Sequence, residues 1–191
     1  MLTTLPNLIE GKRIKLERLQ FKHAQDLKTS CGHPRVWRYQ FESWKRLLDG
    51  GVDSVVHYLV DKAAKGDSSA YAITESGNPV GIIACARDES EAVLISTWMG
   101  IPWFGAGVNT EAKLLLLKSV FAEGASIVQF KVDCENGRAI HALLKFGIHS
   151  KQLIPGHWSR GGITTDVILF ELRRDDWPKV ENKLVMSLSG R

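Results

Sequence analysis

The sequence predicts a single α/β domain (α+β in the broader sense), with a mixed central sheet of six to seven strands and about four flanking helices. Residues 93–99 are mostly β-branched and apolar, as in a buried strand. A glycine turn and a long apolar segment at 110–121 follow, which favours a buried helix. Residues 127–132 then return to a strand pattern. Such a unit is normally a right-handed parallel crossover, so we expect the two strands to be neighbours.

The composition fits one soluble domain, because 191 residues that are 44% hydrophobic can bury a substantial core. Residues 1–10 lack a basic start, and no run of 18 apolar residues occurs anywhere. We therefore expect no signal peptide, no membrane span and a cytoplasmic location. Cys31, Cys85 and Cys134 are odd in number and lack metal-ligand spacing, which predicts reduced thiols and no metal site.

A net charge of +4 and a pI near 9.0 fit either nucleic acid or a cofactor that carries several phosphates. The basic pairs Lys12–Arg13, Lys45–Arg46 and Arg173–Arg174 are isolated along the chain. Isolated pairs are typical of a solvated surface rather than of a binding stripe. We therefore rank nucleic-acid binding below cofactor binding.

The first half of the chain supplies one strand and two helices. Residues 13–19 alternate charged and apolar side chains, which predicts a strand with one wet face. Residues 23–30 predict a short helix, and an aromatic segment at 36–41 follows it. Residues 52–65 carry apolar side chains at helical spacing without glycine or proline, which indicates a second helix.

The middle of the chain predicts a hairpin. Residues 70–74 and 80–86 have strand composition, and Ser76-Gly77-Asn78-Pro79 between them is a strong turn signal. Together with residues 93–99 they should form an antiparallel meander. If the strands at 93–99 and 127–132 splay apart further on, the gap between them is a natural ligand slot.

The turn at Gly105-Ala106-Gly107 is the strongest candidate binding element. Two alternate positions without Cβ let backbone N–H groups converge on an anion at the start of the next helix. Asn109 or Thr110 is predicted to cap that helix, with Glu111 in its first turn. Neither a Walker pattern nor a dinucleotide fingerprint follows, so a simple tight turn is the alternative explanation.

These residues also carry a family resemblance. Pro102-x-x-Gly105-x-Gly107 followed by Thr110-Glu111-Ala112 resembles the pyrophosphate loop of the GNAT superfamily of N-acetyltransferases, in particular its RimL-type, ribosomal-protein-serine acetyltransferase-like branch. Asp133-Cys134-Glu135-Asn136 resembles the D-x-x-N of that branch. Residues 142–147 and Asp176-Trp177-Pro178 resemble its later elements, so the resemblance covers roughly residues 10–184.

The resemblance implies a GNAT fold that uses acetyl-coenzyme A, with the splayed slot holding the pantetheine arm. It divides the chain into an N-terminal extension at 1–9, the acetyltransferase domain at 10–175, and a C-terminal helix or tail at 176–191 that packs on the domain. The implied cofactor contacts are Trp98, Met99, Gly100, Trp103, Phe104, Gly105, Ala106, Gly107, Val108, Thr110 and Asn136. A buried aromatic ring at Trp98 and a helix cap at Asn136 are the structural alternatives.

The resemblance also implies an acceptor groove, but its residues are less well determined. Trp37, Tyr39 and Asp166 are the candidates to contact an acceptor, and Phe41 and Trp44 belong to the same aromatic segment. For each aromatic residue taken singly, packing in the core is the favoured explanation.

The chain departs from the family at the catalytic groups. The family's N-x-x-S, whose serine would donate a proton to the leaving sulfur, reads Asn136-Gly137-Arg138-Ala139 here. The strand at 92–100 contains no carboxylate, so Ser96 and Thr97 are the candidates to position a catalytic water. Asp166 and His157 are further candidates, and a structural hydrogen bond is the favoured role of both.

The predicted activity is acetyl transfer from acetyl-coenzyme A to a primary amine, by direct attack in a ternary complex. An α-amino group has a pKa of roughly 8, against about 10.4 for lysine, and so depends less on a base. A protein N-terminus is therefore the favoured acceptor, with small amines as the other class. The alternative is an acyl-coenzyme A-binding domain with weak or lost catalysis that acts as a sensor or binding partner. Whether the protein is a homodimer is left open.

Overall fold

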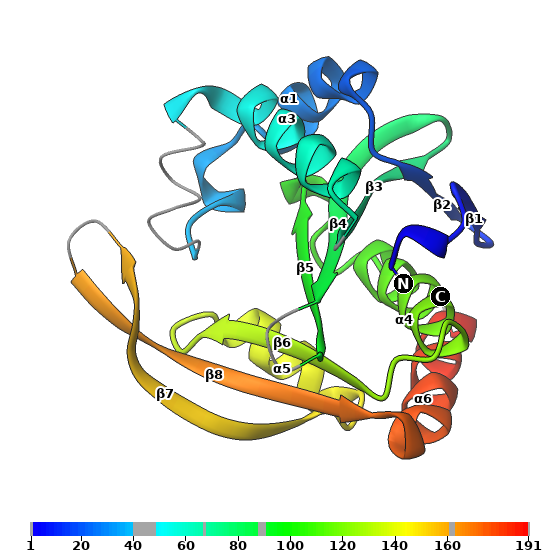
Figure 1. Ribbon diagram of the computed structural model, residues 1–191, viewed down its shortest axis with the longest axis vertical. Coiled ribbons are helices and arrows are strands. Elements are labelled where there is room, and N and C mark those ends of the chain that lie inside the picture. The colour runs from blue at the N-terminus through cyan, green and yellow to red at the C-terminus, as the bar shows by residue number, and fades with distance from the viewer. Residues whose placement is uncertain (1, 40–48, 67, 88–90, 161–162, 191) are drawn as a thin grey trace.

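The computed structural model describes residues 2–39, 49–66, 68–87, 91–160 and 163–190. Eight strands form one mostly antiparallel sheet in the order β1-β2-β3-β4-β5-β6-β8-β7 (Figure 1). The strands are β1 (Leu8–Glu10), β2 (Ile14–Arg18), β3 (Ser68–Glu75), β4 (Asn78–Arg87), β5 (Val93–Met99), β6 (Ile127–Asp133), β7 (His149–Arg160) and β8 (Ile163–Arg173). The α-helices are α1 (Ala24–Cys31), α3 (Gly51–Ala64), α4 (Val108–Ala122), α5 (Gly137–Lys145) and α6 (Trp177–Ser189).

The predicted α/β fold with a mixed sheet is confirmed, and the sheet has one strand more than the six to seven expected. The additional strand is β1, which pairs antiparallel with β2 from Leu8 opposite Glu17 to Glu10 opposite Lys15. Three residues are too few to show a strand period in the sequence. Leu2 and Leu5 are each only 3% exposed and belong to the main core. Side chains from the predicted N-terminal extension at 1–9 thus pack into the core.

The hairpin of β3 and β4 is confirmed. Ser76 and Gly77, with φ of 51° and 82°, join the two strands. Positive φ at both central residues matches the right-handed twist of the strands, which is why such turns are favoured in two-residue hairpins. Nearly every residue of both strands is buried, because helices cover the sheet on both sides.

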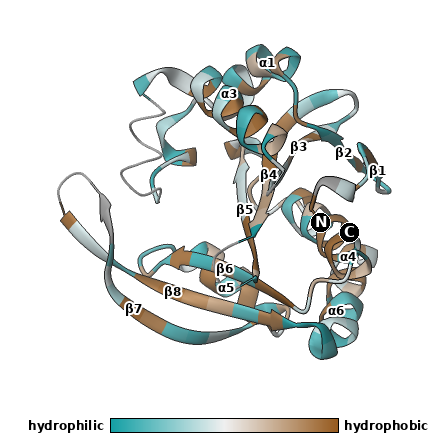
Figure 2. Ribbon diagram, viewed as in Figure 1, coloured by the Kyte–Doolittle hydropathy of each residue, from teal (hydrophilic) through white to brown (hydrophobic). Residues whose placement is uncertain are grey.

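Alternate residues of the central strands face two separate cores. Ala70, Ala72 and Ile82 face α1 and α3, whereas Tyr71 and Ile73 face the core formed with α4, α5 and α6. Figure 2 shows that α4 and β8 consist mostly of hydrophobic residues. The predicted burial of this helix is confirmed, because Ala112, Leu116, Leu117, Val120 and Phe121 are among its buried residues. In the described part of the chain, no helix is both long and apolar enough to cross a bilayer.

The predicted splay between β5 and β6 is present. The two strands are parallel and pair only at Val93 with Val128 and at Leu94 with Gln129. Beyond this point β6 turns to β8 and pairs with it antiparallel over its whole length, as far as Asp133. From Ile95 to Met99, β5 is paired with β4 alone. The splay leaves one edge of β5 without a strand neighbour, and Figure 1 shows β6 diverging from it.

Candidate active site

A cavity of about 900 Å³ follows β5 from Leu94 to the loop that leads into α4. One end lies where β5 and β6 still pair, and the other lies near Met99 and the loop at 103–107. At about 3.3 Å per residue, the stretch from Leu94 to Met99 spans roughly 17 Å. The cavity is thus an elongated slot along the unpaired edge of the strand.

Most residues that the sequence predicts for the site line this cavity. The predicted residues found in its lining are Tyr39, Ser96, Thr97, Trp98, Met99, Trp103, Phe104, Gly105, Gly107, Thr110 and Asn136. The predicted residues that lie outside it are Trp37, Gly100, Ala106, Val108 and Asp166. Phe41 and Trp44 fall outside the described residues. The structure therefore gathers most of the predicted residues along one slot.

Trp37 and Asp166 lie outside the lining and make structural contacts, which is the role that the sequence favoured for each of them. Trp37 is 6% exposed, its indole N–H donates to the carbonyl of Cys31 at 2.7 Å, and its ring stacks on Trp98 with 5.8 Å between centroids. Trp37 therefore supports the β5 strand from within the core. Asp166 accepts the backbone N–H of Gly156 at 2.9 Å and so shapes the irregular part of β7.

The loop before α4 has an exposed helix start. Gly107, with φ of 89°, is the residue at the N-cap, and no side chain caps the helix. The predicted cap at Asn109 or Thr110 is wrong, because a left-handed glycine lets α4 begin at Val108 and places both residues inside the first turn. Gly105 has φ of 75°, also in the left-handed region. An uncapped helix start beside such a turn fits a bound phosphate.

Two cations that the sequence analysis missed line the same end of the cavity. Lys113 is half-buried and donates to Asn109 Oδ1 at 2.6 Å. Burial lowers the pKa of Lys113 to about 8, and the nearby charge of Arg138 adds to the shift. The Arg138 guanidinium lies 3.5 Å from the centre of the Phe104 ring. The spacing of Asn109 and Lys113, one helical turn apart, was the signal that could have revealed the first of them.

The start of α5 forms the opposite wall. Asn136 Oδ1 accepts the backbone N–H of Ala139 at 3.2 Å, which confirms its role as a helix cap, and its side chain also lines the cavity. Ala139 is half-buried in the same lining. Asp133 is the one carboxylate among the described lining residues, and it accepts the backbone N–H of Glu135 at 2.8 Å.

Basic and aromatic side chains from other elements also line the cavity. Tyr58 and Lys62 come from α3, with the ammonium of Lys62 5.8 Å from the Tyr58 ring. Lys131 and His157 come from β6 and β7. Burial lowers the pKa of His157 below its ordinary 6.5, and the charge of Lys131 lowers it further. The imidazole is therefore mainly neutral at pH 7 and able to accept a proton.

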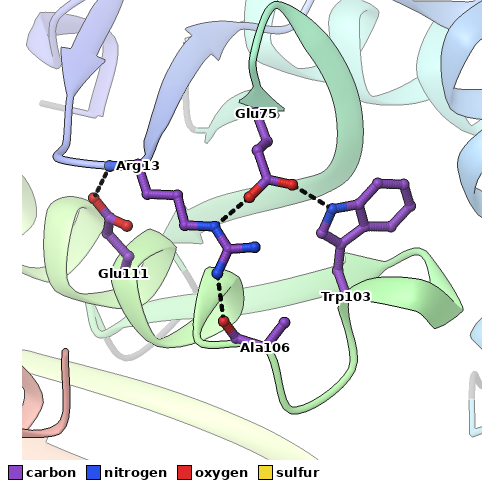
Figure 3. A network of polar contacts seen from close by, with 5 residues as sticks. All are labelled: Arg13, Glu75, Trp103, Ala106 and Glu111. Atoms are coloured by element: carbon purple, nitrogen blue, oxygen red, sulfur yellow. Dashed lines mark hydrogen bonds and ion pairs between the residues drawn. The ribbon is translucent and has the colours of Figure 1, made fainter. Parts of the chain in front are cut away.

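Arg13 is exposed, as predicted for a solvated basic pair, but it also makes contacts that the sequence did not indicate. Arg13 forms an ion pair with Glu75 and donates to the carbonyl of Ala106 at 2.7 Å, in the loop that lines the cavity (Figure 3). No local sequence pattern indicates this contact, because the three residues lie far apart in the chain.

A family model described as an acetyltransferase (GNAT) domain matches residues 13–149. No curated protein sequence matches the chain. A candidate acetyltransferase from T. thermophilus has a TM-score of 0.82 at 24% identity, with 97% of this chain and 98% of that chain covered. RimJ of Mycobacterium smegmatis, in complex with CoA-disulfide, has a TM-score of 0.82 at 18% identity, with 95% of each chain covered. RimL, described as a ribosomal L7/L12 alpha-N-protein acetyltransferase in complex with coenzyme A, has a TM-score of 0.76 at 14% identity, with 87% of this chain and 97% of that chain covered.

Proposed function

Because the chain belongs to the acetyltransferase (GNAT) family, we propose that it transfers an acetyl group from acetyl-coenzyme A to the α-amino group of an acceptor. The observation that carries the proposal is the cavity along the unpaired edge of β5, whose lining combines the phosphate-binding features of the loop before α4 with a neutral imidazole from β7. RimL is described as an alpha-N-protein acetyltransferase, which supports a protein N-terminus as the acceptor.

The residues of the slot fit acetyl-coenzyme A. When bound, this cofactor supplies an activated acetyl group on a long arm that ends in several phosphates. The uncapped start of α4 after Gly107, together with Lys113 and Arg138, provides the N–H groups and positive charge for those phosphates. β5 pairs with β6 only at Val93 and Leu94, so beyond the splay its edge can pair with an extended arm as an added strand would.

The polar groups near the middle of the slot favour an α-amine over lysine. β5 has no carboxylate, and the one described carboxylate in the lining, Asp133, already accepts a backbone N–H. An α-amine with a pKa of roughly 8 is partly neutral at pH 7, whereas a lysine near 10.4 requires a strong base. Ser96 and Thr97 hold a water beside the amine, and His157 takes up the proton that it loses.

The test compares two peptides of equal length, one with a free N-terminus and no lysine, the other N-blocked with one lysine. We expect the first to be acetylated with at least about tenfold higher kcat/KM, in line with its larger neutral fraction. A preference for the lysine peptide would contradict the proposal.

The same assay separates the enzyme from the alternative of a binding domain. If calorimetry detects acetyl-coenzyme A binding but no peptide or small amine is acetylated, the binding-domain alternative is favoured.

Two further expectations belong to this proposal. The three cysteines are free thiols, which suits a cytoplasmic enzyme, and association into a homodimer would be measured by sedimentation.

A further inference from the structure

We propose that Arg13 and Glu75 are positioning residues that hold the loop Trp103–Gly107 in the shape that binds the phosphates of acetyl-coenzyme A. The inference depends on the assignment of that loop to the cofactor in the proposed function, and it adds two residues from distant segments that do not face the slot themselves. Neither Arg13 nor Glu75 is among the residues that line the cavity.

A single carboxylate and a single guanidinium contact both ends of the loop (Figure 3). One oxygen of Glu75 pairs with Arg13 Nε, and the other accepts the indole N–H of Trp103 at 2.6 Å. A second nitrogen of the same guanidinium donates to the carbonyl of Ala106 at 2.7 Å. Trp103 is where the loop begins and Ala106 is where it turns into α4, so the ion pair spans the loop.

The ion pair is itself anchored to α4. The backbone N–H of Arg13 donates to Glu111 Oε1 at 3.0 Å, and Glu111 is 6% exposed in the first turn of the helix. Gly11 lies against the same carboxylate so closely that an added Cβ would be 2.3 Å from Glu111 Oε1. The start of β2 is therefore fixed on the helix whose N-terminus faces the slot.

The loop requires such support because its own backbone constrains it weakly. Gly105 and Gly107 both have positive φ, and glycine loses more conformational entropy on ordering than any other residue. The internal contact from the Ala106 N–H to the Trp103 carbonyl is long, at 3.3 Å. A loop that must be ordered when the cofactor binds lowers affinity, so bonds that order it beforehand raise affinity.

The Glu75 carboxylate is held in its charged form. Burial alone would raise the pKa of Glu75, but hydrogen bonds from Trp103 and Arg13 and the charge of Arg13 outweigh burial and lower it. The Glu75 side chain is 19% exposed, whereas the partners of the Lys15–Glu10 pair are 54% and 62% exposed. The Lys15–Glu10 pair between β1 and β2 is therefore a suitable control, because its two side chains are exposed and pair with each other.

The experiment measures acetyl-coenzyme A binding to Glu75→Gln by calorimetry without any acceptor, so that its result does not depend on the proposed α-amine. We expect Kd to rise about tenfold, the effect of losing one charged hydrogen bond in an ordered loop. The KM for acetyl-coenzyme A should rise in proportion, while kcat at saturation and the KM for the acceptor stay within about twofold. Glu10→Gln should leave all four quantities unchanged.

A second variant tests whether the residues act as one unit. Arg13→Gln should weaken acetyl-coenzyme A binding to a similar extent. The double variant Arg13→Gln/Glu75→Gln should bind the cofactor no less tightly than the single variant with the higher Kd. If Glu75→Gln does not fold, Arg13→Gln alone supplies the measurement. An unchanged Kd accompanied only by a lower Tm, or additive losses in the double variant, would overturn the proposal, because either result is what a merely structural ion pair gives.

Discussion

At the scale of single residues, two positions in the lining of the slot are unusual. Lys113 is less basic than an ordinary lysine, and Ala139 lacks the hydroxyl of the serine in the family pattern. Lys113 carries a pKa of about 8 because it is buried near Arg138, so it is only partly charged in mildly basic solution. Ala139 lies in the cavity lining where the family places a serine. Each difference leads to a measurable consequence for binding or for turnover.

Lys113 should make cofactor affinity dependent on pH. Phosphates beside Lys113 stabilise its charged form, so binding raises its pKa and takes up a proton wherever the free residue is neutral. Affinity should therefore be full below pH 7 and fall by about tenfold between pH 7 and pH 9, as expected from a free pKa of about 8. Lys113→Arg should remove this dependence, because arginine stays charged.

Calorimetry of acetyl-coenzyme A binding across that pH range measures the effect. Lys118 lies on the same helix with a side chain that is 71% exposed, so Lys118→Arg should retain the wild-type pH dependence. An equally steep loss of affinity in Lys113→Arg would show that another group is responsible.

Ala139 should limit kcat rather than the affinity for acetyl-coenzyme A. Asn136 Oδ1 caps α5 by accepting the backbone N–H of Ala139, and the Ala139 side chain is half-buried in the lining, so a serine hydroxyl there would lie in the cavity wall. Ala139→Ser should raise kcat by about tenfold if the missing hydroxyl acts as a general acid, since such groups contribute at least this much. Single-turnover rates of this variant and of Ala139→Val, which adds bulk without a hydroxyl, distinguish an effect of the hydroxyl from an effect of added volume. A serine variant that is no faster than wild type would exclude the role.

At the scale of elements, we expect the start of α4 to be the main determinant of cofactor binding. The helix begins directly after Gly107 with no side-chain cap, which leaves its first N–H groups for a ligand. β5 contributes an open edge, because it pairs with β6 only as far as Leu94. Together the two elements give an open helix end next to an open strand edge.

Gly107→Asp should abolish acetyl-coenzyme A binding while the protein stays folded. The substitution places a carboxylate at the phosphate end and a side chain at φ of 89°. Gly124, at the other end of α4, has φ of 95° and open space around it. Gly124→Asp therefore imposes comparable backbone strain far from the site and should bind normally. Calorimetry with circular dichroism checks both variants, and unchanged affinity in Gly107→Asp would contradict the assignment of the loop.

At the scale of the whole molecule, the sheet separates two cores and the chain ends complete the larger one. Leu2 and Leu5 enter this core from the N-terminal segment, and Trp177 of α6 stacks on Phe121 of α4 with 5.3 Å between ring centres. The slot lies where the sheet divides between β5 and β6, so its shape depends on both halves of the fold.

The N-terminal segment should therefore contribute to global stability. Leu5→Ala should lower the free energy of unfolding by about 2–4 kcal/mol, the usual cost of truncating a fully buried leucine. Leu8, three residues later, is 47% exposed, and Leu8→Ala should cost less than about 1 kcal/mol. Urea titration of the two variants provides the comparison. Equal stability of both would show that residues 2–5 are not part of the cooperative unit.

The sequence by itself determined the elements that depend on local pattern. The strand at Val93–Met99, the helix of α4, the hairpin turn at Ser76-Gly77 and the glycine loop are all confirmed near their predicted positions. Each is set by a hydrophobic period or by a backbone conformation that only certain residues adopt, and both are visible within a few consecutive residues. The splay of the two parallel strands also followed from element order.

Tertiary structure alone decided which side chains meet in the slot. Arg13, Glu75 and Trp103 come from three separate segments, and Trp37 turns from the slot into the core because Trp98 offers a stacking face there. The start of α4 at Val108 depended on the left-handed conformation of Gly107, which the sequence permits but does not require. Contacts between distant segments depend on how the whole chain packs, and no local period records them.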